Sequence, residues 1–144
     1  VIWADLGRRL TAVPLITASD AARVPLNTCY VVALPDPALA LALAAWLNST
    51  WLRAAARATA DPAAGGFARF NARVVAALPL PHGVLRDPVL IQLGRRGIAG
   101  EPVQEEIDGL VAERMRLPAP ARAALVALGG GGATDRGRVA GRGR

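Results

Sequence analysis

Several residue types on which active sites depend are scarce in this chain of 144 residues. Its one cysteine, Cys29, excludes an internal disulfide and a cysteine metal cluster, and a small buried thiol is expected. Its one histidine, His82, follows Pro-Leu-Pro in a loop, and no serine has the context of a nucleophile elbow. The glycine clusters lack phosphate-loop spacing, and metal-ligand spacing is absent. The sequence therefore predicts no catalytic or metal site within the chain.

A long apolar run is also missing. The most apolar stretch covers residues 37–47, whereas a membrane-spanning helix needs roughly 20 residues. The first ten residues are too polar for a signal peptide. We therefore expect no membrane partner and, since nothing marks an oxidising compartment, a cytoplasmic location. A membrane-surface role for the apolar helix is the alternative.

Methionine is nearly absent. The only methionine is Met115, and the sequence begins with Val1. This combination predicts that the chain is a piece of a longer polypeptide, so motifs that are missing here can lie upstream.

Lysine is absent altogether: all 17 basic residues are arginine, and with 11 acidic residues the net charge is +6. Such a charge favours an anionic partner such as nucleic acid. Arginine in particular suits bidentate contacts to phosphate or guanine. The alternative explanation is a GC-rich coding sequence, which also accounts for the many alanines, glycines and prolines.

The pattern that is present predicts an α+β fold, with a small sheet of short strands packed against a long apolar helix. Residues 1–34 are rich in β-branched and aromatic residues between turn signals. The apolar run 29–34 is typical of a strand that is buried on both faces. Asp36 and Pro37 are signals for the start of a helix, which is predicted to reach Ala58.

Three regions follow from the rest of the pattern: a core, a C-terminal helical extension and a Gly/Arg tail, over residues 1–82, 83–128 and 129–144. A short helix or turn is predicted around residues 67–78, an irregular segment with a weak strand or helix at 89–93, and helices after residue 103 and over 121–128. The tail has the composition of a disordered segment. It is either inert or binds nucleic acid without sequence preference through its Arg-Gly dipeptides.

Five polar side chains are the candidates for contact with DNA: Arg53, Arg57, Arg69, Asn71 and Arg73. The first two lie four residues apart on one face of the predicted helix. If residues 69–77 are helical, the last two arginines share a face and can meet one phosphate track. The asparagine can pair with an adenine edge. In the alternative interpretation, Phe67 and Phe70 form core and the arginines are ordinary surface charge.

Three motifs follow one another along the chain. The first is an Asn-Thr element before a strand, Asn27-Thr28, and the second is a Leu-Asn-Ser element in a helix, Leu47-Asn48-Ser49. The third is a glycine, Gly66, followed by the Arg-Phe step Arg69-Phe70 and by a Leu-Pro-x-Pro sequence at residues 78–81. In this order they resemble the target-recognition region at the C-terminal end of adenine-specific N6 DNA methyltransferases of restriction–modification systems. The last motif is also similar to specificity subunits of type I restriction systems. The Ile-Asp-x-Leu-Val element at residues 107–111 resembles a helix that often closes such methylases.

The resemblance covers roughly residues 1–128 and implies a DNA target-recognition segment whose recognition core is residues 1–82. The catalytic signature of the family, an Asp or Asn followed by Pro-Pro-Tyr beside a glycine-rich cofactor loop, is absent from the chain. The resemblance thus implies an upstream methyltransferase domain that uses S-adenosylmethionine, with double-stranded DNA as the partner and no cofactor in this chain. The alternative is a non-catalytic packing or dimerisation element, with the helix over 37–58 as a spacer.

Overall fold

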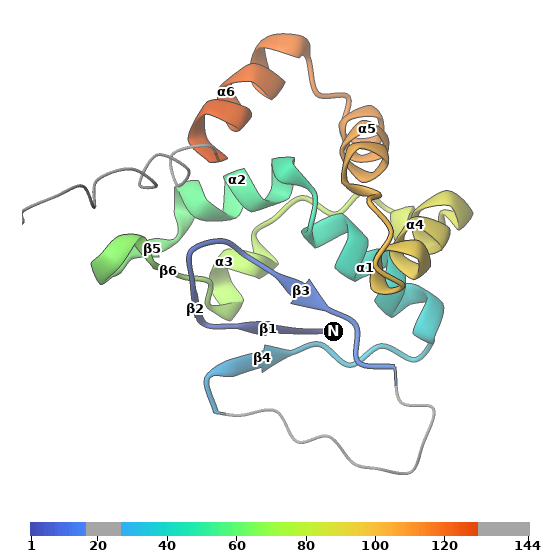
Figure 1. The fold of residues 1–144 in the computed structure, drawn as a ribbon, viewed down its shortest axis with the longest axis horizontal. Coiled ribbons are helices and arrows are strands. Elements are labelled where there is room, and N and C mark those ends of the chain that lie inside the picture. The colour runs from blue at the N-terminus through green and yellow to red at the C-terminus, as the bar shows by residue number, and fades with distance from the viewer. Residues whose placement is uncertain (17–26, 130–144) are drawn as a thin grey trace, which may run out of the picture.

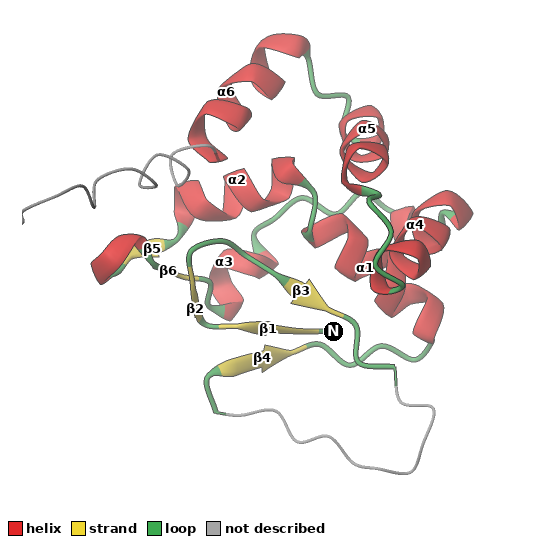
Figure 2. Ribbon diagram, in the orientation of Figure 1, coloured by secondary structure: helices red, strands yellow, loops and turns green. Residues whose placement is uncertain are grey.

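The computed structural model describes residues 1–16 and 27–129, which form an α+β fold as the sequence predicted (Figure 1, Figure 2). Among these residues, six α-helices pack with two small antiparallel sheets. The predicted tail lies outside the described residues, apart from Gly129, which ends the last helix.

The N-terminal segment contributes strands to both sheets. The strands are β1 (Ile2–Ala4), β2 (Leu6–Gly7), β3 (Ala12–Val13), β4 (Cys29–Val31), β5 (Asp61–Pro62) and β6 (Ala68–Arg69). Their order is β3-β1-β4 in the first sheet and β2-β6-β5 in the second. Pairing of β2 with β6 therefore brings the start of the chain beside the Arg-Phe step, and Arg69 lies opposite Leu6.

Strand β4 is not buried on both faces, so this prediction was wrong. It pairs with β1 at the edge of the first sheet, where Val31 is 54% exposed and Cys29 is only half-buried. Its core-facing side holds Tyr30, whose ring stacks on Trp3 with centroids 5.7 Å apart. An antiparallel edge strand covers the core with one face only, which a run of apolar letters does not reveal.

The helices are α1 (Pro37–Leu47), α2 (Thr50–Thr59), α3 (Ala72–Ala76), α4 (Pro88–Ile98), α5 (Gln104–Arg114) and α6 (Ala119–Gly129), with 3₁₀ turns at Ala64–Gly66 and Val84–Arg86. The helices predicted after residue 103 and over 121–128 are confirmed as α5 and α6, although α6 begins two residues earlier. On α5, Ile107 and Val111 are buried while Glu105 and Glu106 are exposed, which is the spacing of an amphipathic helix.

Helix α1 is the centre of the molecule, between the first sheet and α4 (Figure 1). Every residue from Ala40 to Leu47 is buried, because alternate faces of the helix belong to two separate apolar clusters. Leu43 packs with the sheet and Phe70, whereas Trp46 packs with α4 and α5. None of the helices in the part of the chain that the structure describes is long and apolar enough to cross a bilayer.

The long helix predicted over 37–58 is two helices that meet at Asn48 and Ser49. Ser49 has extended backbone angles and its hydroxyl accepts a hydrogen bond from the Leu52 amide (3.3 Å), so it is the N-cap of α2. Short polar side chains offer the backbone such alternative bonds, and here they outweigh continuation of the helix. The prediction of a single helix was therefore wrong.

Helix α4 occupies a segment that the sequence predicted to be largely irregular. Asp87 caps it by accepting from the Val89 amide (2.9 Å), and Pro88 fits its first turn. Gly94 has a low helix propensity but lies within α4, where this helix meets α1. A Cβ at this position would be 2.4 Å from the carbonyl oxygen of Leu41. The glycine thus permits close contact between two helices.

Substitution of Gly94 tests this contact. We expect Gly94→Ala to destabilise the protein by about 2–3 kcal/mol, because the two helix backbones must move apart. Gly109→Ala, in α5, is the matched control, since a Cβ there meets nothing within 4 Å. The control should stabilise the protein by about 0.5–1 kcal/mol through helix propensity. Urea unfolding measures both, and equal effects would contradict the close packing.

Candidate nucleic-acid interface

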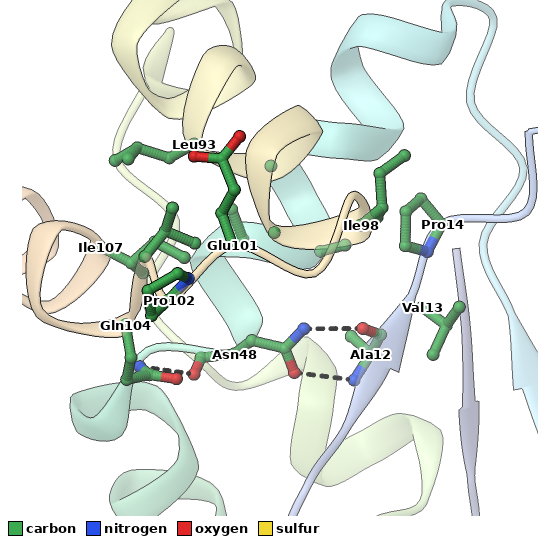
Figure 3. A pocket seen from close by; sticks show the side chains of 15 residues that line it. Ala12, Val13, Pro14, Asn48, Leu93, Ile98, Glu101, Pro102, Gln104 and Ile107 are labelled. Atoms are coloured by element: carbon green, nitrogen blue, oxygen red, sulfur yellow. Dashed lines mark hydrogen bonds between the residues drawn. The ribbon is translucent and has the colours of Figure 1, made fainter.

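The Leu-Asn-Ser element forms a joint between the helices and the first sheet. The side-chain amide of Asn48 donates to the Ala12 carbonyl oxygen (2.7 Å), and its Oδ1 accepts from the Ala12 amide (3.0 Å) (Figure 3). Asn48 therefore satisfies the outer edge of β3 in place of a further strand. An unpaired strand edge is otherwise a liability, so this residue has a clear structural role.

The Ile-Asp-x-Leu-Val element reaches the same joint from α5. The Asp108 carboxylate accepts from the amide (2.7 Å) and the hydroxyl (2.6 Å) of Thr50, at the first residue of α2. The indole of Trp51 donates to the Asp108 carbonyl oxygen (2.7 Å). A carboxylate at a helix N-terminus satisfies free amides and complements the helix dipole. Asp108 thus fixes the start of the helix that carries Arg53 and Arg57.

Arg53, a predicted DNA contact, is held inside this joint. Its guanidinium donates to Leu10 O (3.1 Å), Gln104 Oε1 (3.2 Å) and Asn48 Oδ1 (3.0 Å). Burial lowers the pKa of the Arg53 guanidinium, the charge of Arg9 lowers it further, and Asp108 opposes the shift. Most of the hydrogen-bonding capacity of Arg53 is therefore used within the fold.

One turn further along α2, Arg57 faces a hollow of about 310 Å³ lined mainly by arginines. We call it the arginine hollow; it is lined by Arg8, Arg9, Thr50, Arg53, Ala54, Arg57 and Val126. Within the described residues, none of its four arginines has a carboxylate at ion-pair distance. Nη1 of Arg57 is buried and has no hydrogen-bond partner there either. Positive charges thus converge here without a paired carboxylate in the described part of the chain, and Asp108 offsets them only from beyond ion-pair distance.

Arg8 and Arg9 are the members of the hollow that the sequence did not predict. They lie in the turn after β2, and Arg8 stacks over the Phe67 ring with its guanidinium carbon 5.3 Å from the centroid. Their sequence signal is the Gly-Arg-Arg step at residues 7–9. That step predicts a polar turn, but the meeting with α2 depends on pairing between distant segments.

Arg69 and Arg73 lie elsewhere and face carboxylates. The second sheet carries Arg69 in β6, where it pairs with Asp5 (2.7 Å), and α3 carries Arg73, whose nearest oxygen on Asp61 is 3.9 Å away. Since α3 begins only at Ala72, residues 69–77 are not one helix, and the condition under which the two arginines would share a helix face is not met. The Arg73 side chain is 79% exposed. Exposed pairs of this kind contribute little to stability, so both arginines remain available for other anions.

Asn71, the fifth predicted contact, begins α3. Its Oδ1 accepts from the Val74 amide (3.1 Å), which makes it the N-cap of this helix. The carbonyl oxygen of the neighbouring Phe70 accepts from the Trp3 indole (2.8 Å), and Phe70 is fully buried, as the alternative interpretation predicted. The capping bond uses one lone pair of the amide oxygen and does not use the amide nitrogen.

The charge of the chain is unevenly distributed among its three regions. Residues 1–82 contain seven arginines and four acidic residues, residues 83–128 contain six of each, and residues 129–144 contain four arginines and one aspartate. In the helical extension, Arg96 pairs with Glu101 and Glu106, and Arg114 pairs with Asp87. The extension thus balances its own charge, whereas the core carries a surplus of three.

The hollow in Figure 3, of about 470 Å³, lies between β3, α1, α4 and the segment before α5. Its polar side chains are bonded to the protein: Asn48 to Ala12, Gln104 to Asn48 O (3.2 Å), and Glu101 to Arg96 (2.7 Å). Although this hollow is larger than the arginine hollow, these side chains already have hydrogen-bond or ion-pair partners within the protein. The arginine hollow is chemically the more distinctive site.

Removal of the Asp108 carboxylate tests the joint. We expect Asp108→Ala to lower the free energy of unfolding by about 2 kcal/mol, because two bonds to Thr50 are lost at the helix start. Glu113→Ala, on the same helix but at an exposed pair with Arg114, should change it by less than about 0.5 kcal/mol. Thermal and urea unfolding measure both variants. A cost for Asp108→Ala no larger than that for the control would contradict the joint.

No family model, no curated protein and no solved structure matches this chain.

Proposed function

We propose that this chain is a DNA target-recognition segment of an adenine-specific N6 DNA methyltransferase of a restriction–modification system. In this proposal an upstream domain transfers the methyl group from S-adenosylmethionine, and this chain binds double-stranded DNA in the cytoplasm. The observation that carries the proposal is the charge surplus of residues 1–82, beside a helical extension with equal numbers of arginines and acids. Such a basic region is the electrostatic signature of nucleic-acid binding.

The positions of the quoted motifs support the proposal. Asn48, Ser49 and Asp108, which carry two of the resembling elements, join the helices to each other and to β3. The Leu-Pro-x-Pro close is held by Trp46, whose indole donates to the Pro79 carbonyl oxygen (2.9 Å). If these motifs are shared with the family because they maintain its fold, contacts between helices and strands are where they are expected.

The proposed contacts divide between positioning and readout. Arg69 and Arg73 are exposed and can exchange Asp5 and Asp61 for phosphate oxygens of the backbone. Asn71, between them, presents its amide nitrogen and the second lone pair of its oxygen to a base edge. Arg57 adds charge in the arginine hollow, while Arg53 supports the site from within the fold.

The alternative role as a packing or dimerisation spacer required a free apolar face on the helix over 37–58. Helix α1 is buried from Ala40 to Leu47 by this chain alone, and Leu52, Ala54 and Ala56 of α2 are buried as well. The helix pair therefore leaves little apolar surface for a second copy. This favours the DNA-binding role.

Salt dependence of duplex binding tests the proposal. We expect affinity to fall steeply with salt, with a slope of log K against log salt of about −0.9 for each phosphate contact. Arg69→Ala/Arg73→Ala should make the slope shallower by about two units. Fluorescence anisotropy with a labelled duplex measures both.

The charge-matched control is Arg86→Ala/Arg95→Ala, which removes two exposed arginines from the helical extension. It should leave the slope nearly unchanged. Absence of duplex binding by the unmodified chain, or an affinity that is independent of salt, would refute the proposal. Unchanged binding by the first double variant together with an altered oligomer size would favour the dimerisation role.

A separate substitution addresses base readout. Asn71→Ser retains a capping side chain for α3 but removes the carboxamide. We expect unchanged thermal stability and a loss of about 1–3 kcal/mol of discrimination at one adenine position, measured by selection from a randomised duplex library. A variant that selects the same sequences as the unmodified chain would show that Asn71 serves only as a cap.

A further inference from the structure

We propose that the arginine hollow is a phosphate-binding site in which Arg9 and Arg57 are the charged donors and Arg8 forms the rim. Only its assignment to a phosphate of the DNA backbone rests on the function proposed above. Binding of a phosphate group in the hollow is an independent statement about these side chains. The observations behind it are the convergence of charge, a buried donor without a partner and the chemistry of the walls.

Charge converges on the hollow from two segments that are distant in sequence. Arg8 and Arg9 come from the turn after β2, and Arg53 and Arg57 come from successive turns of α2. Arg9 is close enough to Arg53 to disfavour its charged form. Like charges repel, and in the described residues no carboxylate forms an ion pair with these arginines, although the charge of Asp108 partly offsets the repulsion at Arg53. A bound anion would remove this repulsion.

Arg57 provides the second observation. Its Nη1 is buried without a hydrogen-bond acceptor among the described residues, although a buried cationic donor is costly to leave unpaired. Its neighbour Arg53, by contrast, donates to three acceptors of the fold. The two arginines on one face of α2 thus differ in kind. Arg53 is a structural residue that positions the site, and Arg57 lines the hollow with one donor that the described residues leave unpaired.

The walls favour phosphate over other anions. Guanidinium groups supply only donors, and the Thr50 hydroxyl already donates to Asp108, so the ligand must be rich in acceptors. A carboxylate is satisfied by one guanidinium, whereas a phosphate oxyanion can be bound by several at once. Among the described residues, the apolar wall consists of Ala54 and Val126, and no aromatic ring lines the hollow to stack on a base.

The first experiment uses inorganic phosphate and the whole chain. At constant ionic strength, phosphate should raise the melting temperature saturably, by roughly 3–5 °C at about ten times Kd. Arg57→Gln and Arg9→Gln should each lose most of this shift, and the control Arg95→Gln in α4 should retain it. Without phosphate, Arg57→Gln should melt at a higher temperature than the unmodified chain, because it removes an unpaired buried donor.

Absence of a saturable shift in the unmodified chain would overturn the proposal, as would a full shift in both hollow variants. Arg9 is exposed, so its variant tests the site even if Arg57→Gln does not fold. A lower phosphate-free melting temperature for a folded Arg57→Gln would also contradict it, since that result indicates a structural role.

The second experiment identifies the source of the phosphate. If it belongs to the DNA backbone, Arg57→Gln should make the salt slope of duplex binding shallower by about one unit. If the site takes free phosphate, Arg57→Gln should lose the thermal shift while the duplex slope is unchanged. A phosphate-dependent rise in melting temperature without any duplex binding would support the phosphate site and refute the proposed function. Duplex binding without that rise would support the proposed function and refute the phosphate site.

Discussion

The break between α1 and α2 at Asn48 and Ser49 is the constraint on which the rest of the structure depends. Asn48 satisfies the edge of β3, Ser49 caps α2, and Asp108 binds the first residue of α2 from α5. Because the chain turns here, α1 can be buried on all sides while α2 lies at the surface.

The helical extension supports residues 1–82, the proposed recognition core, through this joint. Two of its six arginines are paired: Arg96 with two glutamates and Arg114 with Asp87. It also supplies Gln104 and Asp108 to the joint that holds Arg53 and Thr50. The surplus of positive charge therefore lies in residues 1–82 and not in the extension. The joint gives those residues a rigid support.

Local signals in the sequence were sufficient for part of this structure. Asp36 with Pro37 predicted the start of α1, and the buried face of α5 followed from its spacing. The break at Asn48 and the close approach at Gly94 depend on partners 36 residues away or more, so local propensity misread both. Of the candidate site, the arginines of α2 were predicted, but their meeting with the Gly-Arg-Arg turn requires the pairing of β2 with β6.

The central claim is that DNA contacts the arginines of the hollow and the exposed Arg69 and Arg73, all within residues 1–82. It does not contact Arg96 and Arg114, which pair with acids of the extension. The most direct measurement is a titration of the isotope-labelled chain with a short duplex, following arginine side-chain Nε–H resonances by NMR. The account predicts shifts for Arg9, Arg57, Arg69 and Arg73, with little change at Arg96 and Arg114. Shifts confined to Arg96 and Arg114, or no shifts at all, would contradict it.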